Sequence, residues 1–538
     1  MLKTNLKIFS NCHRILGNKT WVRVLEALGE DIDVENFPEN LDALKSSLGL
    51  PEYIPDLARI EQAFYQITSD PVVSCHEVDA ICVNPSLKLV PVGWKHLPGL
   101  MAAEPGKEPA VEPCADTHVM VWRHPETGQR HVRAADNTDL LALKITIEKI
   151  EKKTAAAEGG VTIGVIDQTI RHSISQGILI SPISRIRRNA SPEIIAAHGA
   201  ENFLSADTFT LQWHITQACD LHCRHCYDRS QRPPISFDRA VTLLDDLHDF
   251  CESMHVNGQI SFTGGNPLLY PRFIDIYRET VDRGFGAVIL GNPTPPKEIQ
   301  KLLDIAKPSY FQISLEGLEP HNDHIRGEGH FQRSLTFLDQ LRGFDIYSMV
   351  MLTLSNDNIH QVLPLAEMLR NHTDFFTFNR LSTVGEGAQL QMAEPDTYQR
   401  FLRQYHAAAK ENPILGFKDN LINIILHENS AKPFGGCTGY GCGAAFNFVA
   451  LLADGEVHAC RKFPSLIGNI RQHRLTDIYH SKKAQQYRTG SQMCSDCRLN
   501  TVCRGCLAIT HSHGLDVFKE KDPYCFMQPG ASITGRNG

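Results

Sequence analysis

Two hydrophobic periods alternate along the chain between residues 205 and 385. Short runs of β-branched and aromatic residues are separated by longer stretches, such as 237–251 and 272–283, in which apolar residues follow a helical spacing. The short runs predict buried strands, and the longer stretches predict amphipathic helices. Because strands that alternate with helices usually form parallel sheets, we expect this region to consist of βαβ units. The expected strands are 209–213, 259–263, 287–290, 311–315, 347–352 and 375–378.

Roughly six such units predict an α/β fold with an incomplete (β/α)6 barrel over residues 205–412, because the closed barrel of this type has eight units. In barrels of parallel strands, the reactive groups lie in loops at the C-terminal ends of the strands. Functional residues are therefore expected directly after the predicted strands.

The first 190 residues have a different pattern, which predicts a separate N-terminal extension. Residues 1–101 are expected to be a helical domain, because their apolar positions include helical stripes. Residues 102–115 are rich in proline and charge, which is typical of a linker. Residues 116–190 are expected to form a small domain with a β-hairpin and helices. Its strands are predicted at 119–123 and 129–133, and its helices at 136–153 and 161–176.

The composition favours a soluble, cofactor-rich enzyme. The chain has 538 residues, of which 42% are hydrophobic and 21% are charged, so about two to four globular domains are expected. A net charge of -8 provides no basic surface for nucleic acid. No apolar run approaches the roughly 20 residues that span a bilayer, and the first residues lack the core of a signal peptide. Sixteen cysteines then indicate metal ligands in a reducing, cytoplasmic setting.

Three cysteines follow the first predicted barrel strand. Cys219, Cys223 and Cys226 have the spacing C-x3-C-x2-C. Thiolates are the usual ligands of iron–sulfur clusters, and three ligands for four irons leave one iron open to a small chelating molecule. The alternative is a zinc site completed by His222 or His225, although zinc sites favour paired C-x2-C motifs.

The cysteine motif resembles that of the radical S-adenosylmethionine (SAM) superfamily. The resemblance implies a [4Fe–4S] cluster on these three cysteines, with exchangeable SAM chelating the open iron through its amino and carboxylate groups. It also implies that an electron from the cluster cleaves SAM to a 5′-deoxyadenosyl radical.

Two further motifs are similar to the SAM-binding segments of this superfamily. After the second strand stand Gly264, Gly265, Asn266 and Pro267, where the family has Gly-Gly-Glu-Pro and binds the SAM amino group through backbone carbonyls. Asn266 thus replaces an acid. After the fourth strand, Ser314, Glu316 and Arg326 match a Ser-x-Asp-Gly … Arg-Gly segment, with Glu316 in the place of the aspartate. The resemblance implies that Ser314 binds the ribose and that Arg326 pairs with the SAM carboxylate.

Eight cysteines gather in the predicted C-terminal domain, residues 430–530. Eight thiolates can ligate two [4Fe–4S] clusters, and two structural zinc sites are an equal alternative on these residues alone. Their order resembles the SPASM extension of radical SAM enzymes, which holds two auxiliary clusters. The resemblance assigns the first cluster to Cys437, Cys442, Cys460 and Cys506, and the second to Cys494, Cys497, Cys503 and Cys525.

Two departures from the SPASM pattern bear on the chemistry. The spacing from Cys503 to Cys506 is C-x2-C, where the family commonly has C-x3-C, and this bears on the division of ligands between the clusters. Sulfatase-maturing members place an aspartate after the cysteine that corresponds to Cys460, where it takes the substrate proton. This chain has Arg461 there. Arg461 argues against formylglycine formation and leaves the catalytic acid or base unassigned.

The predicted hairpin and helices of residues 116–190 resemble the winged-helix element with which ribosomal-peptide maturation systems recognise leader peptides. In such elements the leader peptide adds as a strand to a sheet edge. A DNA-binding winged helix is the competing interpretation. The segment 161–174 carries few basic residues, which favours peptide binding.

The whole layout resembles peptide maturases of the selenobiotic type. We therefore expect an enzyme that uses the SAM-derived radical to modify a ribosomally made, cysteine-rich peptide. The expected partners are a precursor peptide and a ferredoxin or flavodoxin that reduces the cluster, with neither nucleic acid nor membrane. The alternatives are a radical SAM enzyme for a small molecule or tetrapyrrole, and a non-catalytic iron–sulfur protein that binds peptides.

Overall fold

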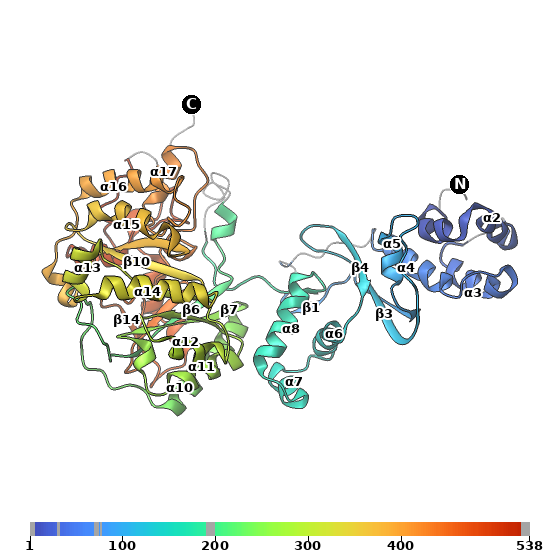
Figure 1. Cartoon of the computed structure of the whole chain (residues 1–538), viewed down its shortest axis with the longest axis horizontal. Coiled ribbons are helices and arrows are strands. Elements are labelled where there is room, and N and C mark those ends of the chain that lie inside the picture. The colour runs from blue at the N-terminus through green and yellow to red at the C-terminus, as the bar shows by residue number, and fades with distance from the viewer. Residues whose placement is uncertain (1–5, 30–32, 69–74, 76–77, 190–199, 529–538) are drawn as a thin grey trace. The chain divides into compact units, whose positions relative to one another are not determined.

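The computed structural model describes residues 6–29, 33–68, 75, 78–189 and 200–528. The chain divides into two compact units, Met1–Ile183 and Ser184–Gly538, coloured blue to cyan and green to red in Figure 1. Among the described residues, no helix combines the length and apolarity needed to cross a membrane.

The second unit is built on six parallel strands that lie side by side in chain order (Figure 1). Every strand expected from the hydrophobic pattern is present, so the α/β class and the six-stranded parallel arrangement are confirmed. The strands are β6 (Thr208–Thr216), β7 (Asn257–Gly264), β8 (Gly286–Leu290), β9 (Tyr310–Ser314), β10 (Ser348–Leu354) and β11 (Phe375–Arg380). The helices that alternate with them are α10 (Phe237–Met254), α11 (Phe273–Asp282), α12 (Pro296–Leu303), α13 (Glu319–Arg326), α14 (His330–Gly343), α15 (Val362–Met368), α16 (Pro395–Ala408) and α17 (Ile422–Glu428).

The two faces of this sheet differ in polarity because successive side chains of a strand point to opposite faces. Trp213 pairs in register with Phe262, and both are fully buried in the large core cluster that also contains the inner residues of α10 and α11. The neighbouring pair is His214 with Thr263, which lies on the other, polar face. The polar face therefore carries the hydrogen-bonding groups close to the C-terminal strand ends.

The cysteine-rich region extends the same sheet. Strand β12 (Phe448–Leu451) pairs in parallel with β6, and β13 (Glu456–His458) and β14 (Leu466–Asn469) follow as antiparallel neighbours. The sheet thus has nine strands. The remaining helices are α18 (Leu475–His480), α19 (Lys482–Thr489) and α20 (Leu507–Ser512). The extension fixes the loop that contains Cys460 beside the end of β6.

The first unit has two hydrophobic clusters, and one of them combines helices with a small sheet. Leu57, Val90 and Val121 belong to the same buried cluster, although the first two come from the stretch predicted as a helical domain. The predicted boundaries at 101, 115 and 190 remain a prediction, and residue 190 lies outside the described residues. The helices of this core are α2 (Ser10–Leu28), α3 (Phe37–Leu48), α4 (Ile54–Gln66) and α5 (Leu97–Ala102).

The sheet of this unit has the order β2-β3-β4, so β4 is an edge strand that pairs with β3 alone among the described strands. Arg123 pairs with Arg130, which confirms the predicted hairpin. Lys149 has a φ of 53° and ends α6, so the helix expected over 136–153 is interrupted. The elements are β1 (Cys82–Val83), β2 (Lys88–Trp94), β3 (Pro113–Arg123), β4 (Arg130–Ala134), β5 (Leu179–Ile180), α6 (Asn137–Glu148), α7 (Lys152–Gly159) and α8 (Ile163–Ser175).

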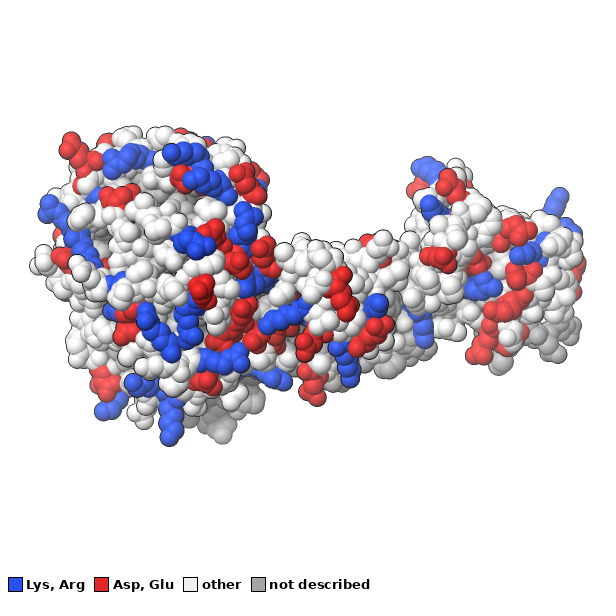
Figure 2. All heavy atoms as spheres, turned by 90° about the horizontal axis from the view of Figure 1, so that it is seen from below, with Lys and Arg blue, Asp and Glu red and all other residues white. Residues whose placement is uncertain are grey.

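Basic and acidic side chains are interspersed on the face drawn in Figure 2. Neither sign forms a continuous stripe on that face, so its electrostatic field is mixed.

Candidate functional site

The three cysteines of the first motif lie on one loop that follows β6. Burial raises the pKa of the Cys223 thiol, and the nearby Cys219 and Cys226 raise it further, so the three sulfurs are close enough to interact electrostatically. Two side chains donate toward this group. Asn292 Nδ2 lies 3.7 Å from Cys219 Sγ, and Arg326 Nη1 lies 3.7 Å from Cys223 Sγ. Such donors suit sulfurs that carry negative charge, as cluster thiolates do.

The spacing of the sulfurs disfavours zinc. A zinc ion with Zn–S bonds of about 2.3 Å brings its tetrahedral sulfur ligands to about 3.8 Å from one another. Among the described residues of either unit, no three potential ligand atoms of His, Cys, Asp or Glu lie within 4.8 Å of one another. His222 is exposed, and His225 Nε2 lies 3.1 Å from Glu316 Oε1. The cysteine loop therefore fits a group larger than a single ion.

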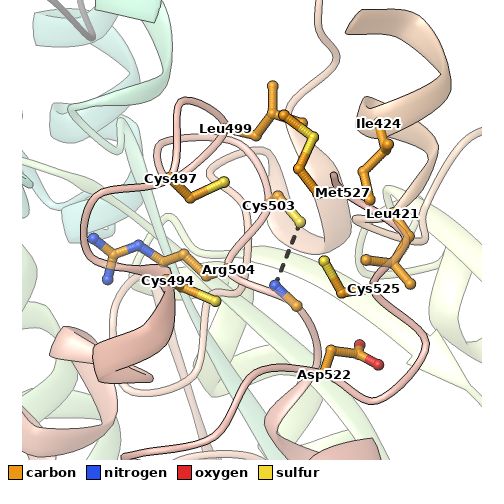
Figure 3. Close-up of a pocket in the computed structure, with 11 residues that line it drawn as sticks. Leu421, Ile424, Cys494, Cys497, Leu499, Cys503, Arg504, Asp522, Cys525 and Met527 are labelled. Carbon is orange, nitrogen blue, oxygen red and sulfur yellow. Dashed lines mark hydrogen bonds between the residues drawn. The ribbon is translucent and has the colours of Figure 1, made fainter. Parts of the chain in front are cut away.

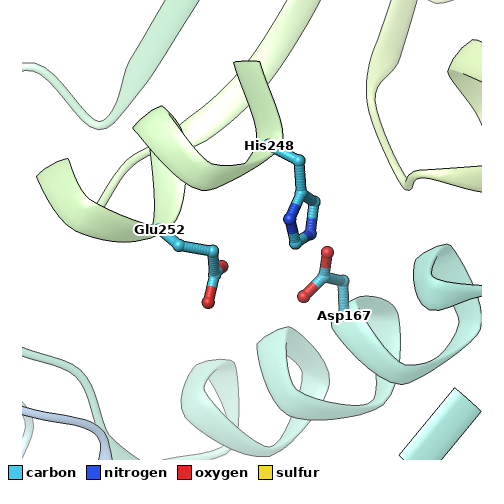
Figure 4. A group of neighbouring side chains, drawn as sticks. All are labelled: Asp167, His248 and Glu252. Atoms are coloured by element: carbon cyan, nitrogen blue, oxygen red, sulfur yellow. The ribbon is translucent and has the colours of Figure 1, made fainter. Parts of the chain in front are cut away.

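Asp167, His248 and Glu252 are a further set of potential metal ligands. Figure 4 draws His248 and Glu252, which lie one turn apart on α10, together with Asp167 of α8. Asp167 belongs to the first unit, and the positions of the two units relative to each other are not determined. These three residues consequently do not define a site.

The glycine pair at the end of β7 lies directly against the cysteine loop. A Cβ on Gly264 would stand 2.2 Å from the Thr216 carbonyl oxygen, and one on Gly265 would stand 2.2 Å from the Ala218 carbonyl oxygen. Gly265 N donates to Thr216 O at 2.8 Å, and Asn266 N donates to Ala218 O at 2.7 Å. Side chains are excluded here because two backbone segments are in contact, which is a structural reason for both glycines.

The replacement of an acid by Asn266 has a local explanation. The buried Asn266 side chain donates through Nδ2 to Asp220 Oδ1 at 3.2 Å, and Asn292 Nδ2 donates to the same oxygen at 2.7 Å. A carboxylate at position 266 would face the Asp220 carboxylate and repel it. Pro267 follows as the first residue of a short 3₁₀ helix. Asn266 thus helps to hold the loop that begins the cysteine motif.

The third motif forms a buried ionic network beside Cys223. Arg326 donates to Glu316 Oε1 from Nε at 2.9 Å and from Nη2 at 2.5 Å, and Glu316 Oε2 accepts from Thr353 N at 2.8 Å. Burial alone would raise the pKa of Glu316, but His225 and Arg326 lower it well below its usual range. Arg326 is therefore held by Glu316 and faces a cysteine sulfur. Ser314 ends β9, and the predicted contacts of Ser314 and Arg326 with SAM remain predictions.

The polar face of the barrel has four side chains close to the cysteine loop. Tyr227 Oη lies 3.1 Å from His214 Nε2, and Arg461 Nη1 donates to Thr263 Oγ1 at 3.1 Å. The Arg461 guanidinium also lies 5.8 Å from the centre of the Tyr227 ring. Burial, followed by the charge of Arg461, lowers the pKa of His214 to about 3, and burial raises the pKa of Tyr227 to about 12. Both rings are neutral at physiological pH.

His214 and Tyr227 were not identified from the sequence. The sequence nevertheless contains a feature that could have identified each of these two residues. His214 stands one position after Trp213 in a strand of period two, so it must point away from the apolar core. Tyr227 directly follows the last cysteine of the motif.

The C-terminal cysteines fall into two groups. Burial raises the pKa of Cys442 to about 11, with Cys506 and Cys437 as further causes. Burial likewise raises the pKa of Cys460 to about 12, with contributions from Cys506 and Cys442. These four thiols are thus neighbours. They are the same four that the resemblance to SPASM domains assigns to the first auxiliary cluster.

The second group surrounds a pocket. Figure 3 shows Cys494, Cys497, Cys503 and Cys525 around a common space. The remaining lining includes apolar residues and two charged ones, namely Leu421, Ile424, Leu499, Met527, Arg504 and Asp522. Gly505 N donates to Cys503 Sγ at 3.4 Å, as the dashed line in Figure 3 marks. A pocket with four thiols, several apolar side chains and a backbone donor to sulfur fits an iron–sulfur cluster.

Buried cations accompany the first group. Arg188 donates to the Tyr440 and Cys442 carbonyl oxygens, and its guanidinium lies 3.9 Å from the centre of the Phe446 ring. Burial, together with nearby Arg504, lowers the pKa of Arg188 to about 9. Two arginines beside Cys442 favour a negatively charged occupant, which a cluster with four thiolates would be.

Comparisons with known proteins agree with this geometry. Residues 213–369 match the radical SAM superfamily, and residues 442–507 match SPASM, an iron–sulfur cluster-binding domain. The chain is thus an enzyme of the radical SAM type. More specifically, it carries a SPASM domain after its radical SAM domain. The two domains imply a [4Fe–4S] cluster that binds SAM, together with auxiliary iron–sulfur clusters.

Several curated proteins are similar over about three fifths of this chain. An AdoMet-dependent heme synthase of Methanosarcina barkeri is 26% identical over 60% of this chain and 97% of its own length. The subtilosin biosynthesis protein AlbA of Bacillus subtilis is 24% identical over 60% of this chain and 72% of its own length. Among solved structures, SuiB of Streptococcus suis has a TM-score of 0.49 and 16% identity, covering 76% of this chain and 96% of its own.

Proposed function

We propose that this enzyme modifies a ribosomally made peptide with a radical derived from SAM. The observation that carries the proposal is the extension before the radical SAM domain, which contains a three-stranded sheet with β4 at its edge. An edge strand can accept an extended leader peptide as a further strand. The maturation proteins AlbA and MftC are relatives of this chain.

In this proposal Cys219, Cys223 and Cys226 hold the cluster that binds SAM. When bound, the cluster and SAM supply the 5′-deoxyadenosyl radical that takes a hydrogen atom from the substrate. Asn292 and Arg326 donate to the sulfurs, and the glycines at the end of β7 allow the loop to approach the strand. The substrate lies on the polar face of the barrel, next to His214 and Tyr227.

The C-terminal cysteines hold two auxiliary clusters in this proposal. Cys437, Cys442, Cys460 and Cys506 hold the first, and Cys494, Cys497, Cys503 and Cys525 hold the second. Their interaction in two groups of four supports this division. A ferredoxin or flavodoxin is the proposed electron donor.

A proline on β4 tests peptide binding. The backbone of Val132 belongs to the edge strand, and Val132 is paired in register with Val121 at a position between His131 and Arg133. Because proline lacks an N–H and is tolerated on edge strands, Val132→Pro should weaken binding of a precursor peptide encoded beside the gene by tenfold or more. Fluorescence anisotropy with labelled peptide measures this, and reductive SAM cleavage should be unchanged. Equal peptide binding by both proteins would contradict strand addition.

Replacement of a cluster ligand tests the radical chemistry. Cys223→Ala removes one of three proposed thiolates, so the reconstituted protein should produce no 5′-deoxyadenosine above background. Cys251→Ala is the matched control, since Cys251 is buried in the helix-covered core, away from the cysteine loop. Persistent 5′-deoxyadenosine formation by Cys223→Ala, measured by liquid chromatography, would refute the ligand assignment.

A carboxylate-bearing tetrapyrrole is a second candidate substrate. Relatives include heme synthases and an Fe-coproporphyrin III synthase, which this chain covers over 87–97% of their lengths. Incubation of the reduced enzyme with SAM and iron coproporphyrin III tests it. Loss of carbon dioxide from the propionates would favour this substrate over a peptide.

A further inference from the structure

Arg461 is a cation on the polar face of the barrel that forms no ion pair with a described residue. Its Nη1 donates to Thr263 Oγ1, and its guanidinium lies 5.8 Å from the centre of the Tyr227 ring. The acidic side chains of the surrounding loops are otherwise engaged. Asp228, Asp454 and Glu456 all pair with Arg232.

The groups in direct contact with this guanidinium are uncharged. Thr263 is a buried hydroxyl residue, and its register partner His214 is buried and neutral. Tyr227 is hydrogen-bonded to His214. A half-buried cation whose direct contacts are neutral has lost part of its hydration without gaining a directly bound anion, so binding of an anion there is favourable.

Arg461 lies close to residues from both cysteine-containing regions of the proposed site, the first motif and the C-terminal domain. Arg461 directly follows Cys460, a proposed ligand of the first auxiliary cluster. Its guanidinium lies 5.8 Å from the centre of the ring of Tyr227, which directly follows Cys226. Thr263 directly precedes the glycine pair. A substrate that reacts with the SAM-derived radical must occupy this part of the polar face.

We propose that Arg461 binds a carboxylate of the substrate and holds it beside the reacting position. The planar guanidinium fork matches a carboxylate with two parallel hydrogen bonds. The proposal rests on the proposed function, and it assigns the substrate to the class of carboxylic acids. The carboxylate belongs either to an acidic residue of a peptide or to a tetrapyrrole propionate.

The proposed role also accounts for the presence of Arg461 where sulfatase-maturing enzymes have an aspartate. An aspartate at this position acts on the substrate proton in sulfatase-maturing relatives, as the resemblance implies. Arg461 reverses the charge, so the position can no longer accept a proton. It serves instead to bind an acid.

Matched acidic and neutral probes test the proposal on the reconstituted holoenzyme. The first pair is iron coproporphyrin III and its tetramethyl ester. The second pair is N-acetylglutamate amide and N-acetylglutamine amide. Equilibrium dialysis gives the affinities of wild type, Arg461→Gln, Arg461→Lys and Arg400→Gln. Arg400 is the control because it also donates to a threonine hydroxyl, at Thr397, but on the exposed side of α16.

In at least one of the two pairs, we expect wild type and Arg400→Gln to bind the acidic probe tenfold or more tightly than its neutral analogue. Arg461→Gln should lose this preference, and Arg461→Lys should keep part of it. Preference for the porphyrin acid alone identifies a tetrapyrrole propionate, and preference for the glutamate probe alone identifies a peptide carboxylate.

SAM binding and substrate-free SAM cleavage provide the second readout. Both should be unchanged in Arg461→Gln if the anion belongs to the substrate. A loss of SAM affinity in this variant would overturn the proposal and assign the anion to SAM, and equal binding of acid and neutral probes by wild type would also overturn it. Absence of SAM cleavage by wild type would instead refute the proposed function.

Discussion

Single residues around the cysteine loop form a charged network that is almost fully enclosed. Glu316 has a side chain that is 2% exposed, and it receives Arg326 and His225 at once. The removal of one partner from a buried ion pair leaves an uncompensated charge, which usually costs more than the pair contributes. The network therefore fixes the orientation of Arg326 toward Cys223. Loss of one of its charged partners is expected to destabilise the protein.

Glu316→Gln should destabilise the protein by about 3–5 kcal/mol, because Arg326 would stay buried without its carboxylate. Glu316 has a lowered pKa in the folded state. Its stabilising effect is therefore complete above the unfolded pKa of about 4.3 and is lost as the pH falls toward the folded value. The difference between variant and wild type, measured by urea unfolding, should shrink below about pH 4.

The control for this prediction is Glu298→Gln. Glu298 pairs with Lys301 on the surface, 32% and 53% exposed, so its loss should change stability little. Equal unfolding free energies for Glu316→Gln and Glu298→Gln at pH 7 would contradict the role assigned to the network.

At the scale of elements, the position of the cysteine loop depends on direct backbone contact with the end of β7. The end of β7 touches the cysteine loop through Gly264 and Gly265, where any side chain meets a carbonyl oxygen. The sequence predicted the position of this turn correctly. It could not predict the contact, because Thr216 and Ala218 approach the glycines only through the parallel pairing of β6 and β7.

Gly265→Ala should displace the cysteine loop, since its Cβ would stand 2.2 Å from the Ala218 carbonyl oxygen. We expect a lower iron content and loss of SAM cleavage. Gly343→Ala is the control, because no atom outside the neighbouring stretch of α14 lies within 4 Å of a Cβ at this position. Iron analysis of both reconstituted variants measures the effect, and full iron content in Gly265→Ala would contradict it.

Some elements could be predicted from the hydrophobic pattern alone, and others could not. The strands of the barrel were predicted because runs such as 259–263 are buried and bounded by helical periods. Strands β12, β13 and β14 were not predicted, since they are four residues long or shorter and lie among cysteines. The contacts of Asn266 with Asp220 and of Arg326 with Glu316 also depend on tertiary placement, although the residues themselves were singled out by their motifs.

At the scale of the whole molecule, the radical SAM and SPASM domains share one sheet. Phe448 of β12 is paired with Thr210 of β6, and Leu451 with Trp213. The buried core continues from the barrel strands into residues such as Val449 and Ile467. The cysteine-rich domain is thus part of the same hydrophobic core as the barrel.

A chain that ends at residue 430 should therefore fail to form a stable barrel. It would expose the outer edge of β6 and the apolar surface that β12 covers. We expect an insoluble product, or a soluble one that binds 8-anilinonaphthalene-1-sulfonate strongly. The control is the full-length chain with Cys494 and Cys497 replaced by serine, which removes two thiols and keeps β12. A soluble, cooperatively unfolding truncated protein would contradict this expectation.

The pairing of β6 with β12 has a consequence for synthesis on the ribosome. Strand β6 leaves the ribosome more than two hundred residues before its neighbour β12. At about 5–20 residues per second, that interval is on the order of ten to fifty seconds. During this time β6 has an open edge of hydrogen-bonding groups, which can pair with other chains. The yield of active enzyme in a cell should therefore depend on translation speed and on chaperones that shield nascent strands.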